Sequence, residues 1–257
     1  MSQEFVLEAR GLTKEFRGFT AVDSVDLKIK EGTIHALIGP NGAGKTTVFN
    51  LLTKYLTPTR GDIRYRGKSI NAMSSNEIAR LGMVRSFQIS AVFPHMTVLE
   101  NVRVALQRPM GNSFHFWKHE KVLNQLNDRA MELLDSVGLA EYADITTVEL
   151  PYGRKRALEL ATTLALEPTV MLLDEPTQGM GHEDVDKVVE LIRKAAQGRT
   201  VLMVEHNLGV VSKLCDKITV LARGAVLAEG DYASVSADPK VREAYMGSDD
   251  TEVQGAH

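Results

Sequence analysis

The sequence feature that most constrains the fold is the glycine-rich stretch GPNGAGKTT at residues 39–47. It fits the pattern G-x-x-x-x-G-K-[ST], with the apolar run Ile34–Ile38 before it and a segment that can continue as a helix after it. This context is typical of a loop whose backbone N–H groups surround phosphate oxygens, aided by the positive end of the following helix. Lys45 is expected to reach the outer phosphates, and the Thr46 hydroxyl is expected to bind Mg²⁺. The alternative is a glycine-rich turn with a chance lysine, which the flanking strand and helix disfavour.

Composition limits the class of protein. The 257 residues suffice for one large domain or two lobes, and the net charge of −3 argues against nucleic acid as a bulk partner. Cys215 is the single cysteine, so no internal disulfide forms and a reducing compartment fits. The first residues lack a secretory pattern, and no apolar run approaches the roughly 18 residues that cross a bilayer. Any membrane role is therefore expected to act through a partner.

The residues before the glycine-rich loop predict strands. Phe5–Leu12 is expected to form the first strand, and residues 14–18 a turn. Apolar and charged residues alternate over 25–30, which predicts a strand exposed on one face. Phe16 fits two interpretations equally well: an exposed aromatic that stacks on adenine, or a hydrophobic plug at a strand end.

The middle of the chain predicts a change of structure. A hairpin over 63–70 and a strand over Met83–Gln88 are expected first. Thr97 and Glu100 have capping-box spacing, and residues 128–138 and 152–166 have helical periodicity. Residues 89–166 are therefore expected to be a helical subdomain inserted into an α/β core formed by 1–88 and 167–247, with 248–257 as a flexible tail. An aromatic cluster in the insertion suits packing within the subdomain better than a partner surface. Its members are Phe114, Phe116 and Trp117.

The core is expected to resume with a buried parallel strand over residues 170–173, which ends in Asp174 and Glu175. An amphipathic helix over 184–197 and a buried strand over 201–204 follow, and the second strand ends in Glu205 and His206. The last expected element is a hairpin over 218–229.

Polar groups at three expected strand ends fit nucleotide chemistry. In an open parallel sheet, ligands bind beyond the carboxyl ends of the strands, so the glycine-rich loop, the Asp174-Glu175 pair and His206 are expected to meet. Asp174 is expected to hold Mg²⁺, directly or through water, and Glu175 to orient and deprotonate a water that attacks the γ-phosphate. His206 is expected to hydrogen-bond the γ-phosphate. A histidine at a strand end is more often structural, and the combination with the loop favours the functional interpretation.

With these motifs in view, the sequence resembles the ATP-binding subunits of ABC transporters from about Phe5 to Gly247. GPNGAGKTT matches the family's Walker A loop, and LLDEP at 172–176 matches Walker B with the catalytic glutamate. LPYGR at 150–154 occupies the position of the signature segment. The finer patterns VEHNLGVV and VLAEGDYASVSADPKVREAYMG are similar to the ATPases of branched-chain amino acid importers, although lipid-export ATPases share much of them.

The resemblance implies a fold and a set of site residues. The fold is an α/β P-loop NTPase core of the ABC type, with an antiparallel β subdomain and an inserted helical subdomain. The implied catalytic residues are Glu175 and His206. The implied metal ligands are Thr46, Gln88 and Asp174. The implied ATP-binding residues are Phe16, Val22, Gly39, Pro40, Asn41, Gly42, Ala43, Gly44, Lys45, Thr46, Thr47 and Gln88. The implied signature contacts to the ATP of a second subunit are Leu150, Pro151, Tyr152, Gly153 and Arg154.

The resemblance also implies partners and a location. Two ATPase subunits, identical or sister chains, would pack head to tail and hold each Mg²⁺-bound ATP between a Walker A loop and a signature segment. The positive end of the signature helix would face the γ-phosphate. Integral membrane permease subunits would dock near Gln88, and a periplasmic solute-binding protein would deliver the solute. The chain would then sit peripherally on the cytoplasmic face of the membrane and hydrolyse ATP to drive uptake of a small solute, a branched-chain or related amino acid.

Two departures from the family pattern bear on the dimer. The signature usually begins Leu-Ser-Gly-Gly-Gln, whereas Pro151 and Arg154 replace the serine and the glutamine. Proline offers a phosphate neither a hydroxyl nor an N–H, and the lost hydrogen bond to a charged group is worth roughly 1.5–3 kcal/mol. Arg154 can restore some attraction, because guanidinium binds phosphate well. The family's D-loop aspartate is also absent, since residues 177–181 read TQGMG.

Three other functions fit parts of the sequence. An ATPase of the same family can drive export or lipid extraction. A soluble P-loop ATPase of DNA repair or translation usually carries a long coiled-coil insertion or a second ATPase half, and this sequence has neither. A small-metabolite phosphotransferase needs an acceptor pocket and has no use for a signature segment.

Overall fold

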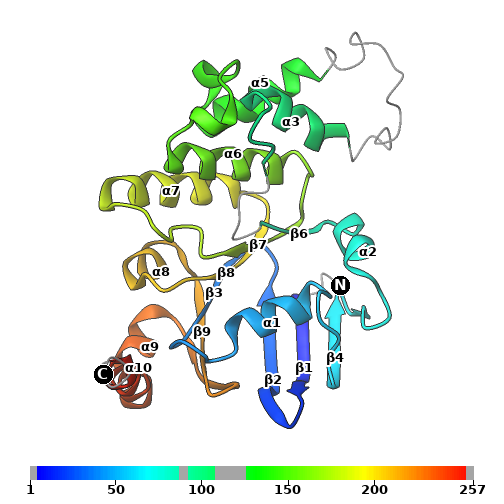
Figure 1. The fold of residues 1–257 in the computed structure, drawn as a ribbon. Helices are drawn as coiled ribbons and strands as arrows, with labels where there is room; N and C mark the ends of the chain where they lie inside the picture. The colour runs from blue at the N-terminus through cyan, green and yellow to red at the C-terminus, as the bar shows by residue number, and fades with distance from the viewer. Residues whose placement is uncertain (1–4, 87–91, 108–125, 253–257) are drawn as a thin grey trace.

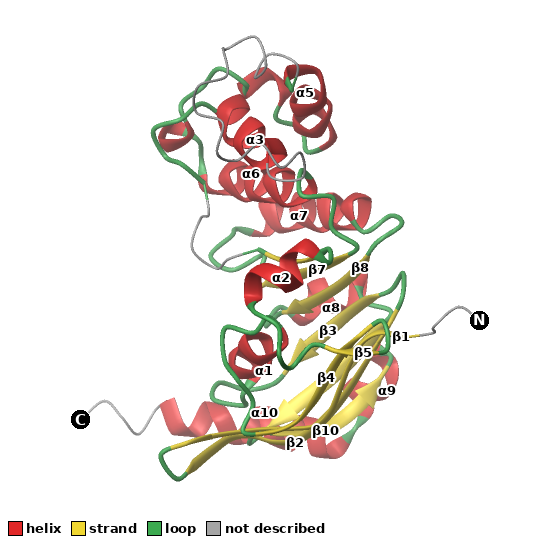
Figure 2. Cartoon of the chain, turned by 90° about the vertical axis from the view of Figure 1, so that its right-hand side faces the viewer, coloured by secondary structure: helices red, strands yellow, loops and turns green. Residues whose placement is uncertain are grey.

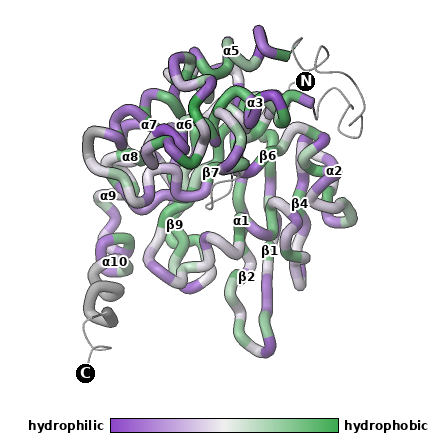
Figure 3. The backbone as a smooth tube through the Cα atoms, turned by 45° about the horizontal axis from the view of Figure 1, so that its top comes forward, coloured by the Kyte–Doolittle hydropathy of each residue, from purple (hydrophilic) through white to green (hydrophobic). Residues whose placement is uncertain are grey.

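The computed structural model describes residues 5–86, 92–107 and 126–252. Over these residues it contains a four-stranded sheet, a six-stranded sheet and helices that pack on both (Figures 1 and 2). This mixed α/β architecture confirms the predicted fold class. Hydrophobic stretches run through the central strands, and hydrophilic stretches lie mainly on outer helices and turns (Figure 3).

The four-stranded sheet is antiparallel, with the order β2-β1-β4-β5. Its strands are β1 (Phe5–Phe16), β2 (Phe19–Lys30), β4 (Arg60–Tyr65) and β5 (Lys68–Ser69). The predicted alternation in β2 is confirmed, because Val25, Leu27 and Ile29 are buried. The expected turn over 14–18 is wrong at its start: β1 continues through Phe16, and the turn is Arg17-Gly18, both with positive φ. Pairing of Phe16 with Phe19 extends the ladder to the hairpin tip.

The six-stranded sheet, in the order β10-β9-β3-β8-β7-β6, contains the predicted buried strands. Neighbours from β9 to β6 are parallel, so their carboxyl ends share one edge. Every residue of β3, β7 and β8 is buried. The strand bounds are β3 (Ile34–Ile38), β6 (Met83–Arg85), β7 (Val170–Asp174), β8 (Thr200–Val204), β9 (Lys217–Ala222) and β10 (Ala225–Gly230). Strand β6 is shorter than the expected Met83–Gln88, and residues 87–91 lie outside the described part of the chain.

Alternate residues of the central strands enter two separate hydrophobic clusters. Leu37, Leu172 and Leu202 pack with the antiparallel sheet and with α1 (Lys45–Leu52). Ala36 and Met203 belong to a second cluster, which also contains the helical segment. The two clusters are separate because successive side chains of a strand point to opposite faces of the sheet. Both faces of the sheet therefore pack against apolar side chains.

The described part of the segment 89–166 is predominantly helical. Its helices are α3 (Val98–Gln107), α5 (Asn127–Ser136) and α6 (Tyr152–Leu164). The predicted capping box is present, because the Glu100 N–H donates to Thr97 Oγ1 (3.1 Å) and the Thr97 N–H donates to Glu100 Oε2 (2.8 Å). The aromatic residues Phe114, Phe116 and Trp117 lie outside the described residues.

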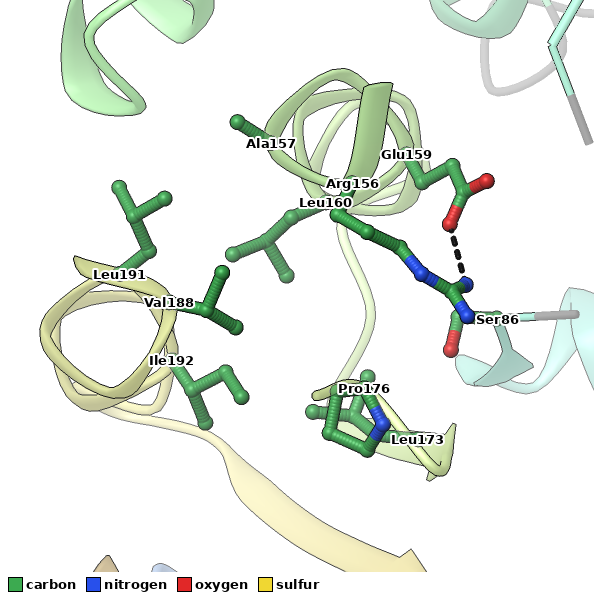
Figure 4. Close-up of a pocket in the computed structure, with 10 residues that line it drawn as sticks. All are labelled: Ser86, Arg156, Ala157, Glu159, Leu160, Leu173, Pro176, Val188, Leu191 and Ile192. Atoms are coloured by element: carbon green, nitrogen blue, oxygen red, sulfur yellow. Dashed lines mark hydrogen bonds and ion pairs between the residues drawn. The ribbon is translucent and has the colours of Figure 1, made fainter. Parts of the chain in front are cut away.

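Helix α7 (His182–Ala195) joins the helical segment to the sheet, because α6 packs along it (Figure 1). A cavity of about 30 Å³ lies between the two helices and the end of β7 (Figure 4). Leu160 and Val188 line it from α6 and α7, and the buried Arg156–Glu159 ion pair (2.7 Å) closes another side. By this measure the cavity has room for about two water molecules.

Four helices in the described part of the chain were not predicted from the sequence. They are α2 (Ser75–Arg80), α8 (Leu208–Leu214), α9 (Tyr232–Ala237) and α10 (Pro239–Glu252). Helix α10 continues to Glu252 and so overlaps the start of the expected flexible tail at 248–257; residues 253–257 lie outside the described part of the chain, and the flexible tail stays a prediction. The packed first turns of α10, with Val241 buried, allow later residues to add to an existing helix, which costs less than starting one. Among the described helices, none combines the length and apolar character needed to cross a membrane.

Candidate functional site

The glycine-rich loop connects β3 to α1 at the carboxyl edge of the parallel sheet. Gly39, Gly42 and Gly44 have φ values of +150°, +74° and +98°, which L side chains rarely adopt. Gly44 is the N-cap of α1 and no side chain caps the helix, so the first N–H groups of α1 stay available to an anion. Thr46 is exposed in this first turn, beside the half-buried Thr47.

Two of these glycines also lie against other strands. A Cβ on Gly39 would come within 2.1 Å of the Leu221 carbonyl oxygen in β9, and a Cβ on Gly44 within 2.6 Å of the Ala21 carbonyl oxygen in β2. The loop is therefore held between the two sheets. Val22 is fully buried, and a methyl group of its side chain lies 3.6 Å from the same Gly44 position. The side chain of Val22 packs against the loop at Gly44, and its predicted contact with ATP stays a prediction.

The Lys45 side chain folds back onto the start of the loop. Its Nζ donates to the carbonyl oxygens of Gly39 (2.6 Å) and Pro40 (3.0 Å), and the residue is 6% exposed. Burial lowers the pKa of Lys45 below its ordinary value of 10.5, and the Glu175 carboxylate opposes that shift. A phosphate oxygen offers this ammonium a full negative charge in place of two neutral carbonyls.

The end of β7 brings the two predicted carboxylates to the same edge. Asp174 is 2% exposed, and its Oδ2 accepts a charge-assisted hydrogen bond from Arg85 Nη2 at 2.5 Å. Glu175 has φ +48°, which turns the chain sharply after the strand. Its Oε1 lies 2.6 Å from His206 Nε2, so the structure joins these two predicted residues across β7 and β8.

Glu205 is a site residue that sequence reasoning missed. It is 2% exposed, and its two oxygens accept from four donors: the Thr177 N–H and hydroxyl, and the N–H groups of His206 and Asn207. This carboxylate holds the turn after β7 against the turn after β8, and so fixes the Glu175–His206 contact. The available signal was a carboxylate directly after a buried strand, immediately before His206.

Phe16 lies at the β1–β2 hairpin tip and is 40% exposed, which disfavours the buried-plug interpretation. Lys14 Nζ lies 5.1 Å from its ring centroid. The start of β2 abuts the glycine-rich loop, so the hairpin places an exposed aromatic ring on that side of the site.

Among the other predicted ATP-binding residues, Asn41 and Gly42 are exposed in the loop, and Ala43 is buried. Gln88 lies outside the described residues.

The predicted signature residues lie on a different part of the molecule. Figures 1 and 2 both show α6 in the helical part, away from α1. Pro151 is the N-cap of α6 and no side chain caps this helix. The Tyr152 hydroxyl donates to the Gln178 carbonyl oxygen (3.0 Å), and the Arg154 guanidinium stacks 3.9 Å over the Tyr142 ring. Leu150 is buried, and Gly153 packs near Asp184.

The donor chemistry of the site fits magnesium and a polyphosphate together. No group of three His, Cys, Asp or Glu residues that could hold a metal occurs in residues 5–86, 92–107 and 126–252. Mg²⁺ usually takes one or two protein oxygens and completes its shell with water and substrate phosphates. A buried carboxylate, Asp174, at the edge that carries the exposed Thr46 hydroxyl matches that pattern.

Comparisons with known proteins agree with this geometry. Residues 22–178 match the ABC transporter family, and residues 225–251 match the branched-chain amino acid ATP-binding cassette transporter family. The high-affinity branched-chain amino acid transport ATP-binding protein BraF of Pseudomonas aeruginosa is 39% identical, over 94% of this chain and 98% of its own. The ADP conformation of MJ1267, an ATP-binding cassette of an ABC transporter, superposes with a TM-score of 0.82 at 28% identity, covering 95% and 100% of the two chains. A dimeric post-hydrolysis structure of the cassette MJ0796 has a TM-score of 0.73 at 25% identity, covering 88% and 98%.

Proposed function

This chain belongs to the ABC transporter ATP-binding family, and from that premise we propose that it powers the uptake of a branched-chain or related amino acid. It is an ATP-binding subunit that hydrolyses ATP. The importer assignment rests on the relatives' transport function and on the match of residues 225–251 to the branched-chain cassette family. We place it peripherally at the cytoplasmic face of the membrane, bound to integral permease subunits and served by a solute-binding protein.

The observation that carries the catalytic proposal is the convergence of the glycine-rich loop, Glu175 and His206 at one edge of the parallel sheet. Residues 39–47 hold the phosphates through main-chain N–H groups, and Lys45 exchanges its two carbonyl partners for phosphate oxygens. Phe16 stacks on the adenine. Glu175 orients the attacking water and accepts its proton, while His206 holds the carboxylate and reaches the γ-phosphate.

Magnesium belongs to this proposal through the oxygen ligands of the site. Thr46 and Asp174 would hold it, with Gln88 as a third candidate. When bound, the metal neutralises charge on the β- and γ-phosphates. The protein's share is to keep Asp174 buried and in place before nucleotide arrives.

We also propose that residues 89–166 act as a helical subdomain and that two ATPase subunits face each other across ATP. The dimeric structure of MJ0796 supports the second part. Pro151 and Tyr152 begin α6 without a side-chain cap, so the end of this helix is free to meet a phosphate of the other subunit. Arg154 is engaged by Tyr142 and has to leave that ring before it can bind phosphate.

Pro151→Ser is expected to tighten ATP-driven dimerisation. The added hydroxyl restores a hydrogen bond to a charged group, worth about 1.5–3 kcal/mol, or roughly ten- to a hundredfold in the dimer dissociation constant. The measurement is analytical ultracentrifugation with ATP, in a Glu175→Gln background that slows hydrolysis. Pro168→Ser, which precedes β7, is the matched control. An unchanged dissociation constant for Pro151→Ser would refute the proposed role of this position.

Purification of the intact membrane complex tests the transport proposal most directly. The expected result is a complex with two permease subunits that retains or transports a branched-chain amino acid and consumes ATP with water as acceptor. Recovery of a lipid or of an exported compound would assign the chain to the export branch. Phosphate transfer to a small metabolite would contradict the transport proposal altogether.

A further inference from the structure

Arg85 is a partly buried cation that the proposed mechanism does not use. It is the last residue of β6, and its side chain is 11% exposed. One guanidinium nitrogen donates to Asp174 Oδ2 in β7 (2.5 Å), and the other donates to Asn50 Oδ1 in α1 (2.6 Å). The guanidinium also lies 5.7 Å from the Phe49 ring centroid. Arg85 therefore contacts both the metal-site carboxylate and the helix that starts at the glycine-rich loop.

The shape of the guanidinium explains why arginine suits this position. Its rigid planar fork directs two donors at two acceptors at once, which a lysine ammonium on a flexible stem does not do. Asn50 lies in the same helix as Lys45 and Thr46, and Asp174 ends the strand that precedes Glu175. One side chain thus fixes the spacing between the phosphate-binding helix and the carboxylate that faces it.

Charge gives Arg85 a second effect. A buried carboxylate is costly unless a cation or a set of hydrogen bonds compensates it, and Asp174 is 2% exposed. Arg85 supplies that compensation when no metal is present. A divalent cation that approaches Asp174 then meets a carboxylate that already has a positive neighbour. Attraction between metal and carboxylate is reduced by repulsion between metal and guanidinium.

We propose that Arg85 is a positioning residue that holds Asp174 and α1 in register and acts as the counter-charge that Mg²⁺ must share or displace. This inference rests on the proposed function, because it takes Asp174 as the metal carboxylate. Removing the guanidinium charge should therefore have two opposite effects. The metal-free protein becomes less stable, and its affinity for Mg²⁺ increases.

The test uses the full chain with Arg85→Gln and follows Mg²⁺ and ADP binding without measuring hydrolysis. The expected apparent Kd for Mg²⁺, titrated calorimetrically into the ADP complex, is about tenfold lower than in the unmodified protein, since a unit charge a few ångströms away is removed. The thermal midpoint in EDTA is expected to fall, and Mg²⁺ with ADP to recover most of the loss. Arg64→Gln is the matched control, because Arg64 pairs with Asp62 at 2.6 Å in the antiparallel sheet, and it should leave Mg²⁺ affinity unchanged.

Arg85→Lys separates charge from geometry and covers the case in which Arg85→Gln does not fold. It keeps the positive charge and loses the double contact, so its Mg²⁺ affinity is expected within about threefold of the unmodified protein, with a lower thermal midpoint. Unchanged or weaker Mg²⁺ binding by Arg85→Gln would overturn the proposal, as would equally strong tightening by Arg85→Lys.

If the proposed function is wrong, the experiments give a different result from the one that overturns the role of Arg85. If the unmodified chain bound no ADP even in EDTA, the nucleotide site itself would be wrong. The pairing of Arg85 with Asp174 could still be measured from the thermal midpoints of Arg85→Gln, Asp174→Asn and the double variant without ligand. Additive effects in that cycle would remove the basis for this inference, whereas strong coupling would retain it.

Discussion

Glu175→Gln is expected to lower the steady-state rate of ATP hydrolysis by about 10²- to 10⁴-fold, the usual contribution of a positioned general base. The amide keeps the size of the side chain and cannot accept the proton of the attacking water. Affinity for ATP should stay within about threefold, because we propose that residues 39–47, and not this carboxylate, hold the phosphates. Phosphate release and equilibrium binding of a fluorescent ATP analogue measure the two effects separately.

Glu190→Gln is the matched control for that experiment. Glu190 is an exposed glutamate of α7 that pairs with Arg193, and its replacement should leave both rate and affinity unchanged. A rate for Glu175→Gln within tenfold of the unmodified protein would show that another group accepts the proton. A parallel loss of ATP affinity would instead assign Glu175 to ground-state binding.

Gly39→Ala is expected to abolish ATP binding and to destabilise the fold. A Cβ at this position would lie 2.1 Å from the Leu221 carbonyl oxygen, and that oxygen belongs to the backbone of a central strand, so it cannot move aside cheaply. Overpacking typically costs about 1–3 kcal/mol. The φ of +150° adds strain of about 1–3 kcal/mol for a residue with a side chain. Urea denaturation and ATP titration measure the two losses.

Gly32→Ala distinguishes steric overlap from backbone strain. Gly32 has φ +76° in the turn before β3, with no heavy atom within 4 Å of an added Cβ. Its alanine variant should lose about 1–2 kcal/mol from the left-handed backbone alone and bind ATP normally. If Gly39→Ala were no less stable than Gly32→Ala and still bound ATP, the close packing of the loop against β9 would not matter for function.

Elements with strong local signals were predicted well. The buried strands β3, β7 and β8 have continuous apolar runs, and the Thr97 capping box marks the start of α3. Short helices such as α8 and α9 were missed, because six or seven residues give little periodicity and their caps, Asn207 and Asp231, resemble ordinary turn residues. Helix α10 was also missed, because its first turns are stabilised by tertiary packing and not by a local pattern.

Sequence alone singled out the glycine-rich loop, the carboxylate pair at the end of β7 and His206 as candidate site residues, since each is a local pattern tied to a strand end. Tertiary structure alone decided which atoms these groups face: His206 on Glu175, Arg85 between Asp174 and Asn50, and Glu205 across two turns. Contacts of this kind join residues that are tens of positions apart in the chain. Their geometry depends on the order and register of neighbouring strands, which no single stretch of sequence encodes.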